Sequence, residues 1–177
     1  MNSKDLCMLR HIPELIDAGI SSFKIEGRMK SVFYVASVVS AYRKAIDAYC
    51  SDPASYEFNP QWFEDMCKAS HREFTTGFYF HKPDNLDQNY RTSEYTRDYS
   101  FVGMVKSYDS ETGYAIVGDK IEIFGPGIDS FEQDLREMYD EEGNPIESAP
   151  HPQQILKIKV DKPVKPFFMF RKRKETK

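Results

Sequence analysis

The sequence predicts an α+β fold in which a helical first part precedes a second part of short antiparallel strands. Over roughly the first 80 residues, apolar side chains recur at helical spacing. Beyond residue 98, short apolar runs alternate instead with turn signals. A polar stretch at 81–98 lies between the two patterns. We therefore expect a helical segment at 1–80, a linker at 81–98 and a strand segment at 99–177.

Composition limits the class of protein. A chain of 177 residues with 40% hydrophobic residues can bury the core of one domain or of two small ones. No run reaches the roughly 20 apolar residues of a membrane helix, and the N-terminus has no apolar signal core. Three cysteines, an odd number, argue against a disulfide framework and for a reducing compartment. We expect a cytoplasmic protein without a membrane segment.

Capping signals predict three helices in the first part. Pro13 suits the first turn of a helix and Gly19 its end. Ser31 suits the N-cap of a long helix that ends at Asp52-Pro53. Asn59-Pro60 begins a third helix. The apolar stripe expected on the long helix is Val32, Val35, Ala36, Val39, Tyr42, Ile46 and Tyr49, and the buried face expected on the third is Trp62, Phe63 and Met66.

An alternating segment before the long helix predicts a short strand. Apolar Phe23 and Ile25 alternate with charged Lys24 and Glu26, so the two charges share one face. If the apolar pair packs against helices, the charged pair faces whatever the sheet encloses. Burying charge is costly unless the charges are paired or serve a site, which favours active-site lining.

Arg28 and Lys30 fall at the carboxyl end of this predicted strand, where barrels and open α/β sheets bind ligands. We therefore predict Lys24, Glu26 and Arg28 as candidate catalytic residues. The structural alternative is that Lys24 and Glu26 simply neutralise each other, with Arg28 solvated beyond the strand.

The segment Ser70–Phe80 is rich in aromatic and basic residues and is interrupted by Gly77. Aromatic rings beside basic residues can stack on nucleic-acid bases. The alternative is that Phe74, Phe78 and Phe80 belong to the core, and we favour it because aromatic residues are regularly buried.

The second part predicts a small antiparallel barrel. In Ile155–Val160, Leu156, Ile158 and Val160 point inward and the lysines outward. The other strand candidates are Phe101–Val105, Tyr114–Val117 and Lys120–Phe124, and the turns are Asp109–Gly113, Gly125–Gly127 and Glu142–Pro145.

Positive charge concentrates late in a chain whose net charge is −4. Such a patch can contact phosphates, whereas a charge run is also typical of a solvated terminus. The candidate nucleic-acid-binding residues are Lys157, Lys159, Arg171, Lys172 and Arg173.

Cys7, Cys50 and Cys67 lie far apart, and by spacing alone they form no metal or cluster site. We expect Cys50 and Cys67 to pack in the core, whereas Cys7 occupies a loop position, where sites accumulate. The four histidines show no ligand spacing, and no nucleophile or metal motif of a peptidase is present. This argues against independent peptidase activity.

Four motifs in order nevertheless resemble one family. They are Asn2–Cys7, Phe23–Ser31, Ser70–Phe78 and Ala149–Gln154, and together they are similar to the C-terminal part of the peptidase U32 family, the collagenase-like proteases. The resemblance implies that Asn2 to Ile46 is the end of a TIM-type barrel. It also implies that 99–177 is a small β-barrel similar to those of translation elongation factors.

The resemblance implies two kinds of activity. Members are called peptidases, and other branches resemble iron–sulfur hydroxylases of transfer RNA wobble uridine, ribosomal RNA or ubiquinone precursors, with prephenate implicated in the transfer RNA branch. Cys7 then resembles the last of four cysteine ligands of a [4Fe–4S] cluster, with three more upstream, so we expect no cluster in this chain alone. We favour transfer RNA hydroxylation. The alternatives are a collagenase-like peptidase and a non-catalytic RNA- or protein-binding module.

The expected partners are transfer RNA or another RNA, and either a second copy of the chain or a missing upstream barrel to cover its apolar helix faces. The chain departs from the family pattern in two places. Relatives carry additional residues between Val117 and Gly118. They also have Pro-Gly-Asp where this chain has Pro166-Phe167-Phe168, which lacks the turn glycine.

Overall fold

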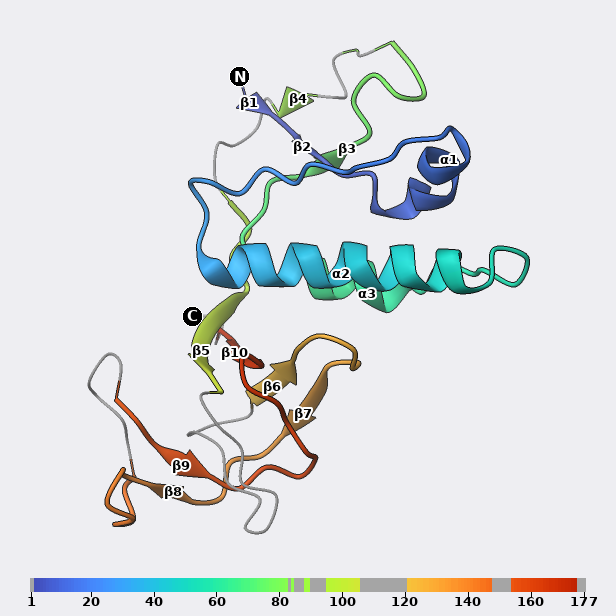
Figure 1. Cartoon of the computed structure of the whole chain (residues 1–177). Coiled ribbons are helices and arrows are strands. Elements are labelled where there is room, and N and C mark those ends of the chain that lie inside the picture. Colours follow the sequence, from blue (N-terminus) through green and yellow to red (C-terminus); the bar gives the residue numbers. More distant parts are fainter. Residues whose placement is uncertain are drawn as a thin grey trace. The chain divides into compact units, whose positions relative to one another are not determined.

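The computed structural model describes residues 2–82, 84, 88–89, 95–105, 121–147 and 154–174. The chain forms two compact units, Met1–Asp98 and Tyr99–Lys177 (Figure 1). Helices belong to the first unit and antiparallel sheet dominates the second, so the α+β prediction is confirmed. Within the described ranges, no helix is long and apolar enough to cross a membrane.

The first unit combines helices with two small strand pairs. Strand β2 pairs with β3 in parallel, and β1 pairs with β4 in antiparallel orientation. Its elements are β1 (Asn2–Ser3), β2 (Asp5–Leu6), the 3₁₀ helix η1 (Leu9–His11), α1 (Ile12–Asp17), α2 (Val32–Ser51), α3 (Pro60–Cys67), β3 (Phe74–Thr75) and β4 (Gln88–Asn89).

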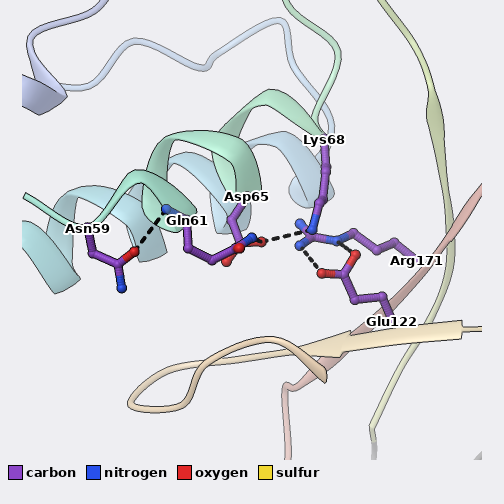
Figure 2. A network of polar contacts seen from close by, with 6 residues as sticks. All are labelled: Asn59, Gln61, Asp65, Lys68, Glu122 and Arg171. Atoms are coloured by element: carbon purple, nitrogen blue, oxygen red, sulfur yellow. Dashed lines mark hydrogen bonds and ion pairs between the residues drawn. The ribbon is translucent and has the colours of Figure 1, made fainter. Parts of the chain in front are cut away.

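The predicted caps define the helices. Ser31 Oγ accepts a hydrogen bond from the Tyr34 amide at 3.2 Å and begins α2. Asn59 Oδ1 accepts one from the Gln61 amide at 2.9 Å and begins α3 (Figure 2). Gly19 follows α1 with a φ of 81°, a conformation that favours glycine.

The buried face of α2 follows the predicted stripe only in the second half of the helix. Tyr49 is buried and Tyr42 and Ile46 pack against the core, as predicted. Val32, Val35 and Val39 are exposed, so the prediction was wrong for them. The helix has apolar residues on more than one side, so helical periodicity alone does not determine which side packs inward. Its buried residues are Phe33, Ser37, Val38, Ala41, Ala45 and Tyr49. Val38, Ala41 and Ala45 share a core with Leu9, Ile12, Trp62 and Met66.

The segment around Phe23 is not a strand, so that prediction was wrong. A strand requires a neighbouring backbone to hydrogen-bond with, and no described segment pairs with this one. The predicted alternation nevertheless holds. Phe23 and Ile25 are half-buried and pack against the core of helices, whereas Lys24 and Glu26 are exposed.

The second unit contains a four-stranded antiparallel sheet in the order β5-β10-β6-β7 and a separate β8-β9 pair (Figure 1). The described residues form no closed barrel. The predicted strand 114–117, the turn 109–113 and the Val117–Gly118 junction lie outside them. The strands are β5 (Tyr99–Met104), β6 (Ile121–Phe124), β7 (Phe131–Gln133), β8 (Met138–Tyr139), β9 (Lys157–Ile158) and β10 (Met169–Arg173).

The alternation predicted for Ile155–Val160 is confirmed. Leu156, Ile158 and Val160 are buried, and both lysines between them are exposed. The predicted turn after β8 is present, with Gly143 at a φ of 94°. Only Lys157–Ile158 forms a strand, because the ladder with β8 is two residues long.

A buried ion pair crosses the middle of the large sheet. Arg171 of β10 donates from Nε and Nη2 to the two carboxylate oxygens of Glu122 on β6, both at 2.9 Å (Figure 2). The two side chains are 0% and 5% exposed, and the guanidinium lies 4.5 Å from the ring centroid of Phe124. Because two charges inside a core are tolerated only when they satisfy each other, this pair specifies the register of β10 against β6.

The Pro166-Phe167-Phe168 departure has a structural consequence. Phe168 is buried and its ring lies against Gly125, where a Cβ would overlap it. Phe167 is exposed and has a φ of 71°, a left-handed conformation that glycine adopts without strain. A bulky residue there is unfavourable.

We expect the Arg171→Met variant to lose about 3–5 kcal/mol of unfolding free energy, because Glu122 is left buried without its partner. Urea unfolding of the chain measures the loss. The control is Arg173→Met, an exposed residue on the same strand, which should change little. An Arg171→Met variant as stable as this control would contradict the assignment.

We expect the Phe167→Gly variant to gain about 1 kcal/mol, because glycine adopts a positive φ without steric cost. Phe167→Ala removes the exposed ring but keeps the Cβ, so it separates backbone strain from surface hydrophobicity. Thermal unfolding compares the two variants. Equal stability of the glycine and alanine variants would show that backbone strain contributes nothing.

Candidate functional site

The parallel pair β2–β3 positions the candidate site. Cys7 directly follows β2, and its amide donates to the Thr75 carbonyl at 2.9 Å. The Asp5 amide donates in the same way to the Glu73 carbonyl at 2.8 Å. Since the carboxyl ends of parallel strands lie at the same edge, the Cys7 thiol emerges where ligands usually bind in such sheets.

A cleft of about 650 Å³ opens at this edge, within the first unit. Its lining combines charged groups, tyrosines and a thiol with apolar side chains. The charged residues, the histidine, the tyrosines and the cysteine of the lining are Lys4, Asp5, Cys7, Lys24, Glu26, Lys30, Tyr34, Tyr42, His71, Arg72 and Tyr79. Three predicted site residues, Cys7, Lys24 and Glu26, therefore share one cleft.

The Cys7 thiol is half-buried beside Tyr42. The Tyr42 hydroxyl donates toward Cys7 Sγ at 3.9 Å and accepts from the Met8 amide at 2.9 Å. Burial raises the pKa of the Cys7 thiol, while the Leu9 amide, the Tyr42 hydroxyl and Arg10 act to lower it. Burial, with the negative charge of a Cys7 thiolate, also raises the pKa of Tyr42 well above its usual range. Without a bound cation, Cys7 therefore stays a neutral thiol.

Two of the three predicted catalytic residues, Lys24 and Glu26, line the cleft. Lys24 Nζ is 3.9 Å from a Glu26 carboxylate oxygen, and the two side chains are 88% and 73% exposed. They are not enclosed, and an exposed pair of this kind adds little stability. Arg28 is exposed and does not line the cleft, although its amide donates to Glu26 Oε1 at 3.3 Å.

Two further ion pairs bind the cleft walls together. Arg72 donates from Nε and Nη2 to Asp5 Oδ1, at 3.0 and 2.9 Å, and its amide donates to Asp5 Oδ2 at 3.0 Å. Lys4 Nζ lies 3.0 Å from a Glu73 carboxylate oxygen. Both pairs join the start of β2 and the residue before it to the two residues that precede β3, so they support the cleft from the side of Cys7.

His71 is a cleft residue that sequence reasoning missed. Its Nδ1 lies 2.8 Å from the Ala69 carbonyl, and its ring stacks on Phe74 at a centroid distance of 4.9 Å. A carbonyl only accepts, so in the neutral ring Nδ1 carries the proton and Nε2 holds the lone pair. The Nε2 lone pair of His71 is therefore free of the Ala69 contact and can accept a hydrogen bond. The spacing of the histidines did not identify His71 as a site residue, although His71 lies within Ser70–Phe78, the third family-like motif.

The aromatic segment 70–80 is divided between core and surface. Phe74 packs against Phe63 in the core of helices, as predicted. Phe78 and Phe80 are 84% and 54% exposed, so the core prediction was wrong for them. Gly77, at a φ of 58°, turns the chain after β3 and carries the following rings to the surface.

The candidate RNA-binding residues of the second unit do not form a uniform surface. Lys157, Lys159 and Arg173 are exposed, with Lys157 Nζ donating to the Glu141 carbonyl at 2.8 Å. Lys172 is half-buried. Arg171 is fully buried against Glu122, so we leave it out of any nucleic-acid surface.

The thiols do not form a cluster site by themselves. The described residues contain no group of three candidate metal ligands. Cys67 is half-buried on α3, and its pKa is raised to about 11 by burial and by the charge of a Cys7 thiolate. Cys50 is exposed, contrary to the prediction that it packs in the core. Since clusters are held by several thiolates, one thiol in the cleft fits a single ligand position and no more.

Two protein-family models match the chain, one over each of its two parts. The model of peptidase family U32 matches residues 1–89, and that of the U32 C-terminal domain matches 97–171. The chain belongs to peptidase family U32. The part of the fourth family-like motif that includes His151 lies outside the described residues.

Several U32 relatives carry names that refer to transfer RNA. The chain is 42% identical to tRNA hydroxylation protein P1 of Bacillus subtilis over 98% of its own length and 43% of that protein. It is 34% identical to tRNA hydroxylation protein P of Escherichia coli over 71% of its length and 29% of that protein. It is also 32% identical to a collagenase of Porphyromonas gingivalis, over 99% of its own length and 51% of that protein.

The chain thus spans about half the length, or less, of these relatives. Among solved structures it is similar to the C-terminal domain of a Geobacillus thermoleovorans U32 peptidase. The two chains are 42% identical, and the match covers 41% of this chain and 99% of the Geobacillus domain, with a TM-score of 0.38.

The raised pKa of Cys7 predicts slow alkylation that accelerates as pH rises, because the thiolate is the nucleophile. We expect iodoacetamide to modify Cys7 more slowly than the exposed Cys50 at pH 7.5, measured by peptide mass spectrometry. Tyr42→Phe removes a hydrogen bond that lowers this pKa, so it should slow Cys7 further and leave Cys50 unchanged. A Cys7 that reacts as fast as Cys50 would contradict this description of the cleft.

Proposed function

We propose that this chain is part of a U32 enzyme that hydroxylates transfer RNA at the wobble uridine. The observation that carries the proposal is its 42% identity, over 98% of its length, to a protein named for tRNA hydroxylation. A cytoplasmic location is part of the proposal, because it matches a transfer RNA substrate. In this proposal the cleft receives the nucleotide to be modified, since enzymes that act on a base take it out of its stack into a pocket.

Cys7 is the proposed contribution of this chain to a [4Fe–4S] cluster whose other ligands lie outside it. Its position supports this, because the thiol lines the cleft beside the Tyr42 hydroxyl. The cluster, when bound, supplies redox chemistry. The chain itself supplies a hydrogen-bond donor to the sulfur and a hydrogen-bond acceptor, His71, at the same cleft. Lys24 and Glu26 form a charged rim that orients the entering nucleotide, with Arg28 just outside it.

The remaining family features are also proposals. The first unit corresponds to the end of a TIM-type barrel, and the second to the small β-barrel of the family. The exposed Val32, Val35 and Val39 on α2 then contact the part of the barrel that lies outside this chain. A second copy of the chain is the other candidate to cover this face.

Collagenase-like peptidase activity is the second candidate function. It is supported by the 32% identity to the Porphyromonas gingivalis collagenase over 99% of this chain. A non-catalytic RNA-binding module is the third, supported by the exposed Lys157, Lys159 and Arg173 of the second unit and by Lys172.

The proposal is tested with a chimera in which this chain replaces the matching segment of the Bacillus subtilis relative. We expect the chimera to restore hydroxylated wobble uridine in a strain lacking the endogenous proteins, measured by nucleoside mass spectrometry. Cys7→Ser should abolish the modification, because the thiol ligand is lost. Cys50→Ser alters an exposed thiol and is the matched control.

A stable chimera that leaves transfer RNA unmodified would overturn the proposed function. Gelatin degradation by the same chimera would favour the collagenase alternative. A Cys7→Ser chimera as active as the Cys50→Ser control would remove Cys7 from the site.

A further inference from the structure

Cationic groups gather around one aromatic ring at the edge of the cleft. Lys30 Nζ lies 4.1 Å from the centroid of the Tyr95 ring and 4.9 Å from that of Tyr34. The guanidinium carbons of Arg72 and Arg97 lie 5.6 and 5.9 Å from the Tyr95 centroid. We call these five residues the Tyr95 cluster.

The cluster is built by contacts between distant segments. The Thr96 amide donates to the His71 carbonyl at 2.9 Å, and the His71 amide donates back at 3.3 Å. This antiparallel bridge places Tyr95 and Arg97, on either side of Thr96, beside the cleft wall. Arg72 is fixed by its ion pair with Asp5 Oδ1. The backbone beside Tyr95 and one of the cations are therefore held in place before any ligand binds.

The charge of the cluster is only partly neutralised. Arg72 has a carboxylate partner in Asp5, whereas Lys30 and Arg97 form no ion pair with any described residue. Cation–π contact attracts a cation to a ring but leaves its full positive charge available to an anion. Lys30 and Arg97 thus present two positive charges beside a tyrosine.

The cluster is continuous with the site that holds Cys7. Lys30, Tyr34 and Arg72 belong both to the cluster and to the cleft lining. Burial raises the pKa of Tyr34, as do the nearby negative charges of Asp5 and a Cys7 thiolate. A ligand on the Tyr95 cluster therefore lies next to whatever occupies the cleft.

We infer that the Tyr95 cluster binds a single-stranded RNA segment, with phosphates on Lys30 and Arg97 and a base stacked on the Tyr95 ring. The inference rests on the proposed function, to which it adds the position of the strand that flanks the modified nucleotide. Single-stranded RNA carries one phosphate and one flat base per nucleotide. The cations of the cluster can bind the phosphates, and its tyrosine rings can stack on the bases. An acidic protein segment matches the cations but offers nothing to stack on the ring.

Fluorescence anisotropy of the 177-residue chain with a labelled 12-nucleotide uridine-rich RNA tests the inference. We expect Tyr95→Leu to weaken binding about tenfold through the loss of one stacked base, while Tyr95→Phe, which keeps the ring, binds as the parent does. Lys30→Ala and Arg97→Ala should each reduce the slope of log affinity against log salt by about 0.7, the value for one phosphate contact on a single strand.

Arg43→Ala is the matched control, since it removes an equal charge from an exposed position on α2 that does not line the cleft. It should leave affinity and salt slope unchanged. Because Lys30 and Arg97 are substituted separately, the test still works if one of the two variants misfolds. Circular dichroism verifies that each variant is folded. The inference would be overturned if Arg43→Ala and Lys30→Ala lost RNA affinity equally. It would also be overturned if heparin bound as tightly as the RNA and each variant changed the affinity for both ligands equally.

The outcomes separate this inference from the proposed function. If the chimera hydroxylates transfer RNA while the Lys30 and Arg97 variants bind RNA as the parent does, the Tyr95 cluster is not the binding site and the function stands. If the variants lose RNA binding as expected but the chimera modifies nothing, the binding site stands and hydroxylation fails.

Discussion

The three-point contact between Asp5 and Arg72 is the constraint on which the first unit depends. The two residues are 67 positions apart, and their side chains and the Arg72 amide share three hydrogen bonds. Together with the parallel pairing of β2 and β3, this contact joins the start of the chain to the segment after α3. The Cys7 thiol, the His71 ring and the Tyr95 cluster all depend on that junction for their relative positions.

The second unit also depends on an arginine–carboxylate ion pair, which in this case is buried. Arg171 and Glu122 lie inside the sheet, where neither charge is tolerated without the other. The Asp5–Arg72 pair is partly exposed, with side chains 16% and 23% accessible, so it tolerates solvent and borders a cleft. The buried pair specifies strand register, whereas the half-buried pair shapes a site. The same chemical contact thus serves two purposes, decided by the depth at which it lies.

The cleft combines features that each have an ordinary structural role. Tyrosines carry a polar tip on an apolar body, and cations stack on their rings in many proteins. What distinguishes this cleft is their combination with a half-buried thiol, with Lys30 in the lining and with Arg97 in the adjoining Tyr95 cluster. Lys30 and Arg97 form no ion pair among the described residues. A purely structural cluster would neutralise its cations, as Arg72 is neutralised by Asp5.

Local signals in the sequence determined the helices and their ends, because a cap such as Ser31 or Asn59 acts on amides only two or three residues away. They also determined the alternation at Phe23–Glu26 and Leu156–Val160, since side-chain direction follows from neighbouring backbone. Only the tertiary structure decided which face of α2 is buried, that Arg171 lies in the core, and that Tyr95 meets Lys30. Those outcomes depend on partners dozens of residues away, and no local pattern encodes which of two apolar faces, or which arginine, will find one.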